Sequence, residues 1–158
     1  MYILCYFANL LAWLEIIENI LIKEIYMQVY CGTDIIEVDR IESAIINTKG
    51  FKENVYTKSE IYDIEKIRGK LKYQRYAGRF AAKEAIYKAM SKILIENGIS
   101  LDFCDVEVVN QPELLKRPKV NFFNEKINEI INRCNVQIDI SISHIEKTAV
   151  ATAIVKID

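Results

Sequence analysis

The stretch from Leu71 to Glu96 constrains the fold more than any other part of the chain, because it predicts one long helix. It contains no proline and a single glycine, Gly78, and the pair Asn97-Gly98 that follows it is typical of a helix end. A glycine inside a helix costs about 1 kcal/mol relative to alanine, so we expect a close packing contact at Gly78. At about 100° per residue, small and aliphatic residues gather on one side of the helix and predict a buried stripe. These residues are Ala82, Ala85, Ile86, Ala89 and Ile93.

The opposite side of this helix is not the polar surface that such a stripe normally leaves. It carries Glu84 and Lys88, four residues apart, among the rings of Tyr73, Tyr76, Phe80 and Tyr87. Aromatic rings around one carboxylate indicate a covered surface: a subunit contact, a ligand cleft or both. The alternative is an exposed helix face with a Glu–Lys pair that contributes a few tenths of a kcal/mol, and the spacing alone favours this alternative.

The segments before this helix predict a strand and two short helices. Val29 to Ile36 is rich in β-branched residues and predicts a buried strand. Asp39 is expected to cap a helix from about Arg40 to Thr48. Thr57 and Glu60 form a capping box, which predicts a helix to about residue 68.

The segments after the long helix predict a strand, a polar loop, a helix and two more strands. The last two strands show the alternation of apolar and polar residues that is typical of half-buried strands. In order, the ranges are Phe103–Val109, Gln111–Pro118, Phe122–Cys134, Val136–Ser143 and Thr148–Ile157. Two paired C-terminal strands, an early strand and one dominant helix place the chain in the α+β class.

Length and charge limit the function. With 158 residues the chain has the length of one domain and buries a core without disulfides or metals. A formal net charge of −1 argues against nucleic-acid binding through bulk positive charge, so no nucleic-acid partner is expected. The four cysteines, at positions 5, 31, 104 and 134, lack the spacing of a zinc site. With no convincing secretory signal, they indicate reduced thiols in a cytoplasmic protein.

Three segments together resemble a known family. GRFAAKEAIYKA, from Gly78 to Ala89, closely resembles the signature of the holo-acyl-carrier-protein synthases, which belong to the 4'-phosphopantetheinyl transferases. GTDIIEVDRI, from Gly32 to Ile41, and ISISHIEKTAVATAIV, from Ile140 to Val155, match the same family in the same order. The resemblance implies an antiparallel sheet packed on one long central helix, in a homotrimer with active sites at the subunit interfaces.

The resemblance also implies a reaction. Enzymes of this family transfer the 4'-phosphopantetheine arm of coenzyme A to a serine of an acyl carrier protein and release adenosine 3',5'-bisphosphate. Asp34 and Glu84 are implied to face a magnesium ion, and Mg²⁺ typically takes one or two protein carboxylates together with water and phosphate oxygens. Glu84 or water held by the metal is the candidate to accept the serine proton. Spacing alone favours a different explanation for Asp34, as a turn or cap residue at the end of a strand.

Four further residues match positions that the family uses for binding. Lys88 lies one helical turn beyond Glu84 and suits a phosphate. Arg79 is implied to contact coenzyme A, and His144, the only histidine, to shape the coenzyme A pocket. Because Arg79 lies on another sector of the helix, coenzyme A would have to span two surfaces. Arg40 matches a position that grips the acidic carrier protein, although a solvated arginine is the plain alternative.

Two regions depart from the family pattern. The segment from Ser91 to Ser100 replaces a glycine-rich, phosphate-binding turn and retains only Gly98, so the helix is expected to continue. If so, phosphate contacts would come from Ser91 or Lys92. A degenerate member that binds carrier protein or nucleotide without catalysis is therefore the alternative function.

Residues 1–26 are the second region, because they precede the three segments that match the family. The first fourteen of these residues carry no charge. A membrane span needs roughly 20 apolar residues, so membrane contact is not expected. Two interpretations remain: a helical extension that docks on the domain, a partner or a membrane surface, or a true start at Met27, where members of the family usually begin. The second is favoured, with the transferase domain at 27–158.

Overall fold

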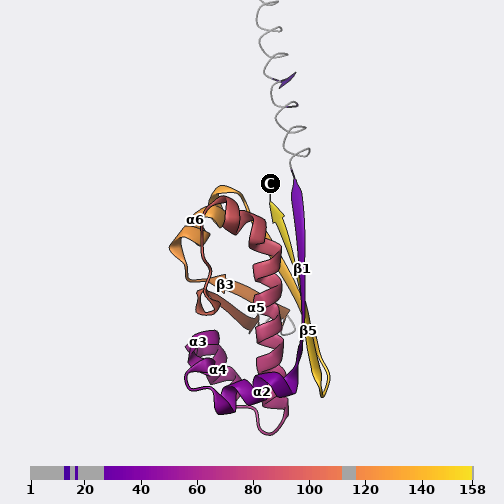
Figure 1. Cartoon of the computed structure of the whole chain (residues 1–158). Helices are drawn as coiled ribbons and strands as arrows, with labels where there is room; N and C mark the ends of the chain where they lie inside the picture. The colour runs from indigo at the N-terminus through magenta and orange to yellow at the C-terminus, as the bar shows by residue number, and fades with distance from the viewer. Residues whose placement is uncertain (1–12, 15–16, 18–26, 112–116, 158) are drawn as a thin grey trace, which may run out of the picture.

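The structure is a computed structural model that describes residues 13–14, 17, 27–111 and 117–157. The predicted helical extension over residues 1–26 lies outside the described residues except for three exposed positions, Trp13, Leu14 and Ile17. In chain order (Figure 1) the elements are β1 (Gln28–Glu37), α2 (Val38–Asn47), α3 (Phe51–Val55), α4 (Lys58–Glu65), α5 (Leu71–Glu96), the 3-10 turn η1 (Phe103–Asp105), β2 (Val106–Gln111), β3 (Arg117–Phe122), α6 (Glu125–Arg133), β4 (Gln137–His144) and β5 (Thr148–Ile157).

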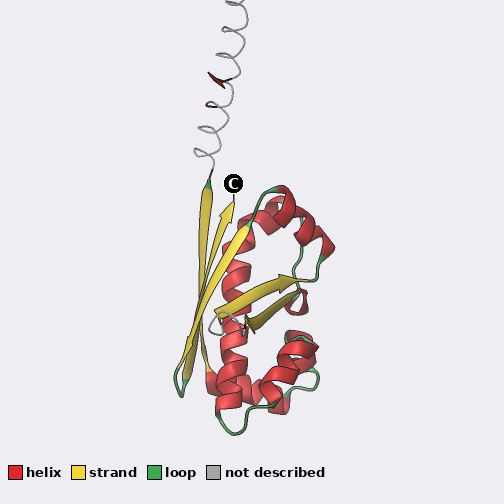
Figure 2. Cartoon of the chain, turned by 180° about the vertical axis from the view of Figure 1, so that it is seen from behind, coloured by secondary structure: helices red, strands yellow, loops and turns green. Residues whose placement is uncertain are grey.

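The long helix α5 is the centre of an α+β fold, as predicted. Strands β1, β5 and β4 form an antiparallel sheet in that order, and β2 and β3 form a separate antiparallel pair. The three-stranded sheet lies along one side of α5, while helices α2 to α4 and the β2–β3 pair lie on the other (Figures 1 and 2). No helix in the described part of the chain is long and apolar enough to cross a membrane.

Helix α5 is buried on two sides, which explains its unusual composition. The predicted stripe packs against the three-stranded sheet, and all five of its residues are buried. On the other side, Tyr76 is fully buried beside Tyr56, and Tyr73 and Phe80 pack around them. The rings of Tyr73, Tyr76 and Phe80 are thus covered by α2 to α4 and η1 of the same chain. Tyr87 is the exception, because it remains 49% exposed.

Gly78 is used for close packing, as expected. A Cβ atom at this position would lie 3.1 Å from Cγ2 of Ile142 in β4, which is tighter than ordinary van der Waals contact. The glycine therefore lets α5 approach the sheet.

Helix α4 begins with the predicted capping box between Thr57 and Glu60.

Several local predictions were wrong. Strand β1 is not buried: it is an edge strand in which only Gly32 is buried, because one of its faces has no cover. Asp39 lies within the first turn of α2, and the cap position belongs to Glu37. Phe103 begins η1 rather than a strand, since the Asp102–Asp105 capping box closes a turn there.

Two elements were missed. Helix α3 has only five residues, too few to show a period. Strand β3 was not predicted, because its first two residues were assigned to a polar loop on account of Pro118, but proline is tolerated in a strand at the edge of a sheet. Helix α6 begins at Glu125, after the cap Asn124, rather than at Phe122.

Glu65 gives the fold an acid-sensitive contact. Its carboxylate accepts hydrogen bonds from the Tyr76 hydroxyl at 2.9 Å and from the Lys52 and Lys72 ammonium groups at 3.2 and 3.3 Å. Burial alone would raise the pKa of Glu65, but these three hydrogen bonds outweigh burial and hold the pKa below its usual 4.5. A depressed carboxyl pKa stabilises the fold above the unfolded pKa, and this stabilisation disappears as the pH falls through the folded pKa.

We therefore expect Glu65→Gln to destabilise the protein near neutral pH by about 1 kcal/mol. The difference in free energy of unfolding between wild type and variant should shrink as the pH falls below about 4.5, because the wild-type carboxyl then becomes neutral as well. Urea unfolding of both proteins at several pH values measures this difference. A difference that stays constant with pH would contradict the role assigned to the Glu65 charge.

Candidate active site

Gly32 brings strand β1 into direct contact with helix α5. A Cβ atom at this position would lie 2.1 Å from the Ala85 carbonyl oxygen and 2.6 Å from the Ala89 amide nitrogen, so no other residue fits without a backbone shift. Alternate residues of a strand face the same side, and Asp34 therefore also faces α5. The glycine thus sets how closely the Asp34 carboxylate approaches the helix.

Lys88, on α5, forms an ion pair with this carboxylate. Its Nζ lies 2.8 Å from Oδ1 of Asp34 and also donates to the Thr33 carbonyl at 3.0 Å. The Asp34 side chain is only 16% exposed, while that of Lys88 is 47% exposed and open to solvent. The structure therefore brings together two of the predicted residues that are 54 positions apart in the chain.

Glu84 lies one turn before Lys88 and faces the same group. Burial and the negative charge of Asp34 both raise the pKa of Glu84, and the positive charge of Lys88 opposes them. Two carboxylates that repel each other beside one ammonium group favour the binding of a further cation. Within the described part of the chain, no cluster of three or more metal-binding side chains occurs. A pair of carboxylates fits Mg²⁺, which needs only one or two, and does not fit a zinc site with its four nitrogen or sulfur ligands.

A pocket of about 300 Å³ adjoins Glu84. Glu84, Tyr87 and Lys83 line it from α5, and the segment through η1 forms the facing wall. The residues of that wall are Leu101, Asp102, Phe103 and Val106. Apart from the two carboxylates and Lys83, its surface is mostly apolar.

Arg79 and His144 meet in a different pocket, of about 190 Å³, together with Arg75. The Arg79 guanidinium donates to Oδ1 of Asn110 at 2.9 Å, and Nδ1 of His144 lies 3.1 Å from Oε1 of Gln74. Burial and the charge of Arg75 both lower the pKa of His144. An uncharged ring among two guanidinium groups suits a binding role.

The predicted site residues therefore form two groups within one chain. At 100° per residue, Arg79 and Glu84 point about 140° apart around α5. The pocket with Arg79 and His144 opens between α5, β4 and the β2–β3 pair, whereas Asp34, Glu84 and Lys88 lie between α5 and β1.

Arg40 belongs to neither group. It is exposed in the first turn of α2, beside a shallow surface depression with Ser43 and Asn47. This is the exposed helix start that the sequence predicts for a protein-binding arginine.

Sequence reasoning missed the role of Lys83, the neighbour of Glu84. Its ammonium group lies 2.7 Å from Oε2 of Glu60, and both side chains are almost completely buried. Burial lowers the pKa of Lys83, while the Glu60 charge opposes this shift. The sequence offers no signal for this role, because helical spacing does not reveal that Glu60 lies opposite Lys83 in the interior.

The region after Lys88 is helical through Glu96, as expected. The Ser91 hydroxyl donates to the Lys88 carbonyl at 2.8 Å, so its hydrogen is already bonded within α5. Lys92, also in α5, is exposed, and its ammonium group donates to Oε1 of Gln28, at the start of β1, at 3.3 Å.

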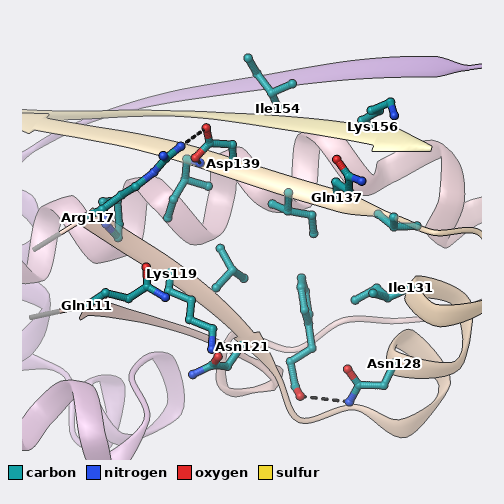
Figure 3. Close-up of a pocket in the computed structure, with 16 residues that line it drawn as sticks. Gln111, Arg117, Lys119, Asn121, Asn128, Ile131, Gln137, Asp139, Ile154 and Lys156 are labelled. Atoms are coloured by element: carbon teal, nitrogen blue, oxygen red, sulfur yellow. Dashed lines mark hydrogen bonds and ion pairs between the residues drawn. The ribbon is translucent and has the colours of Figure 1, made fainter. Parts of the chain in front are cut away.

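A larger cavity lies elsewhere and is lined by none of the predicted site residues. It has a volume of about 800 Å³ and opens between β3, β4 and α6 (Figure 3). Arg117 and Asp139 form an ion pair across one end, and Asn128 donates to the Phe122 carbonyl at the other (Figure 3). Volume alone therefore does not identify the chemical site of this protein.

Comparisons with known proteins identify the family to which the chain belongs. Residues 30–152 match the family model of the 4'-phosphopantetheinyl transferase superfamily. A holo-[acyl-carrier-protein] synthase from Fusobacterium nucleatum is 43% identical over 126 residues, which cover 78% of this chain and 95% of that protein. The enzyme of the same name from Clostridium tetani is 36% identical over 79% of this chain and 93% of its own length.

Solved structures show the same likeness. A holo-(acyl-carrier-protein) synthase from Bacillus anthracis, in complex with CoA (3',5'-ADP), is 30% identical with a TM-score of 0.63, covering 82% of this chain and 97% of that one. The Helicobacter pylori synthase in complex with coenzyme A is 31% identical with a TM-score of 0.61, covering 79% and 98%. The chain therefore belongs to the 4'-phosphopantetheinyl transferase superfamily and is a member of its holo-[acyl-carrier-protein] synthases.

Proposed function

We propose that the site around Asp34, Glu84 and Lys88 transfers the 4'-phosphopantetheine arm of coenzyme A to a serine of an apo acyl carrier protein and releases adenosine 3',5'-bisphosphate. The observation that carries the proposal is the convergence of two carboxylates and one ammonium group from β1 and α5, in a chain of this family. In this type of reaction, positioning and neutralisation of charge matter more than covalent participation by the protein.

Asp34 and Glu84 would hold a Mg²⁺ ion. Their mutual repulsion and their oxygen-only donor set support this assignment. When bound, the ion would neutralise charge on the pyrophosphate of coenzyme A. Lys88 holds the Asp34 carboxylate in place, and its exposed ammonium group also suits a phosphate oxygen. The serine proton passes to Glu84 or to water beside it.

Arg75, Arg79 and His144 would bind the anionic nucleotide part of coenzyme A. Two guanidinium groups in one pocket match the charge of its phosphates. Because this pocket and the carboxylates lie on different sides of α5, one coenzyme A molecule would contact both only if a second copy of the chain completes the site. We therefore propose a homotrimer with active sites between subunits.

The outer face of the three-stranded sheet supports the trimer. Apolar side chains stand exposed there on the edge strand and its neighbour: Val29 is 57%, Ile35 67% and Ile154 47% exposed. Exposed apolar patches of this kind are typical of subunit contacts. Arg40, exposed at the start of α2, would contact the acidic surface of the carrier protein.

The transferase domain is proposed to comprise residues 27–158 and to work in the cytoplasm. Removal of residues 1–26 is expected to leave the transfer rate within about twofold of the full chain, because no described site residue lies before Asp34. Steady-state rates of the two proteins with one carrier protein measure this. A large loss would show instead that the segment recruits or binds a reactant.

Intact-mass measurement tests the proposed reaction. An apo acyl carrier protein is incubated with the full chain, coenzyme A and Mg²⁺, with a parallel sample that contains a chelator. We expect the mass of the carrier protein to increase by one phosphopantetheine arm only in the sample without chelator. Binding of carrier protein or nucleotide without any mass increase would favour the non-catalytic alternative.

A further inference from the structure

Lys83 makes a complete set of hydrogen bonds in the interior of the protein. Its ammonium group bonds Oε2 of Glu60 at 2.7 Å, the Val55 carbonyl at 2.7 Å and the Phe103 carbonyl at 3.0 Å. An ammonium group has three donors, so all of them are used. The side chains of Lys83 and Glu60 are 1% and 0% exposed.

Glu60 likewise uses both of its carboxylate oxygens in hydrogen bonds. Its Oε2 also accepts from the Thr57 amide at 2.8 Å, and its Oε1 accepts from the Val108 amide at 2.9 Å. The ion pair therefore ties α5 to α3, α4, η1 and β2 through fixed atoms. Replacing a buried ion pair by neutral side chains of similar volume is often neutral or stabilising, so stability alone does not account for this pair.

The bond to Phe103 connects the ion pair with the site. Phe103, Leu101 and Val106 form the wall of the 300 Å³ pocket that faces Glu84 and Tyr87. Lys83 holds this wall through its bond to the Phe103 carbonyl, and it sits on the helix position next to Glu84. Together with the Phe80 ring, which stacks on the Phe103 ring at 5.2 Å, the Lys83 bond sets the separation between the wall and the helix that carries the carboxylate.

We propose that Lys83 is a positioning residue for the transfer reaction, and that the pocket it fixes takes the pantetheine arm of coenzyme A. The inference rests on the proposed function. The arm is an elongated chain of methyl and methylene groups interrupted by a hydroxyl and two amides, and it ends in a phosphate. The pocket matches it, with an apolar wall at one side and the Glu84 carboxylate, with its proposed cation, beside it. Lys83 acts on the arm through the Phe103 carbonyl and makes no contact with the reacting phosphate.

The test uses the double variant Lys83→Met/Glu60→Gln in the full chain. The introduced glutamine retains an acceptor for the Val108 amide and the introduced methionine fills the space of the lysine stem, while the bond to the Phe103 carbonyl is lost. Calorimetry gives the affinity for coenzyme A and for 3',5'-ADP, which is coenzyme A without the arm. We expect the affinity of the variant for 3',5'-ADP to stay within about twofold of the wild-type value. We expect kcat/KM for coenzyme A to fall by about a hundredfold. The variant should also no longer bind coenzyme A more tightly than 3',5'-ADP.

A purely structural role would give a different pattern. Equal losses for both ligands, or unchanged kinetics, would overturn the proposal. Lys52→Met is the matched control, because it removes a lysine from an ion pair between α3 and α4 that makes no bond to the pocket wall, and it should leave both affinities unchanged. If the double variant does not fold, the single variant Lys83→Gln, which keeps a donor for Glu60, is measured in the same way and must show the same split.

Because the wild-type chain is assayed first, failure of the proposed function appears as absence of transfer by the wild type. Failure of this inference appears only in the comparison of variants. The two results are therefore distinguishable.

Discussion

Replacing Glu84 by glutamine is expected to lower the rate of phosphopantetheine transfer by about a hundredfold or more while leaving the fold intact. The variant keeps the size of the side chain but removes one of the two carboxylates that face each other across β1 and α5. The raised pKa of Glu84 means that its ionised form is less favourable in the folded than in the unfolded chain. At neutral pH the wild-type charge therefore destabilises the fold, and Glu84→Gln should melt at the same or a slightly higher temperature than the wild type without metal.

Magnesium provides the second readout for this variant. A ligand that binds only the folded state raises the melting temperature, and the stabilisation grows with the logarithm of the ligand concentration once that concentration exceeds Kd. Mg²⁺ should therefore raise the melting temperature of the wild type and have little effect on Glu84→Gln or Asp34→Asn. Thermal unfolding with and without Mg²⁺ measures both effects. An equal Mg²⁺ response in all three proteins would show that the metal binds elsewhere.

Replacing Gly32 by alanine should disrupt the site although it replaces none of its charged residues. The new Cβ atom would overlap the backbone of α5 at the Ala85 carbonyl and the Ala89 amide, so the strand must move away from the helix. Overpacking of this kind costs about 1–3 kcal/mol, and displacement of Asp34 by about 1 Å is expected to lower the transfer rate about a hundredfold. Urea unfolding and the rate of transfer are measured on the same sample.

Gly98 offers the matched control for this substitution. It has a φ of +61°, and no atom lies within 4 Å of the place that a Cβ would occupy, so Gly98→Ala adds the same methyl group in open space. Left-handed backbone costs an alanine about 1 kcal/mol, and the site should be unaffected. A Gly32→Ala protein that loses no more activity than Gly98→Ala would contradict the role of Gly32 in placing Asp34.

The sequence predicts the parts of the fold that depend on local patterns. The helix from Leu71 to Glu96 has the predicted ends, because Asn97-Gly98 stops it and no proline interrupts it. The capping box at Thr57 and the final strand were likewise predicted from neighbouring residues. The burial of a strand was not predictable in this way, because it depends on what packs against the strand. Strand β1 was expected to be buried but is an exposed edge strand.

The site shows the same division. Short motifs identified Asp34, Glu84 and Lys88, but only the three-dimensional approach of β1 to α5 at Gly32 explains why they meet. The spacing of residues indicates a surface charge at Lys83, because helical periodicity does not reveal that Glu60 lies opposite it in the interior. Long-range pairs of this kind leave no signal in the spacing of residues along one chain.

Mixing two inactive variants tests the central claim that two copies of the chain complete one active site. Asp34→Asn removes the carboxylate half of the site, and Arg79→Met removes part of the nucleotide half. Refolded together in equal amounts, they are expected to recover about a quarter of wild-type activity, because that fraction of interfaces in a random cyclic trimer joins two intact halves. Mixed trimers with no recovered activity would contradict the account and place the whole site within a single chain.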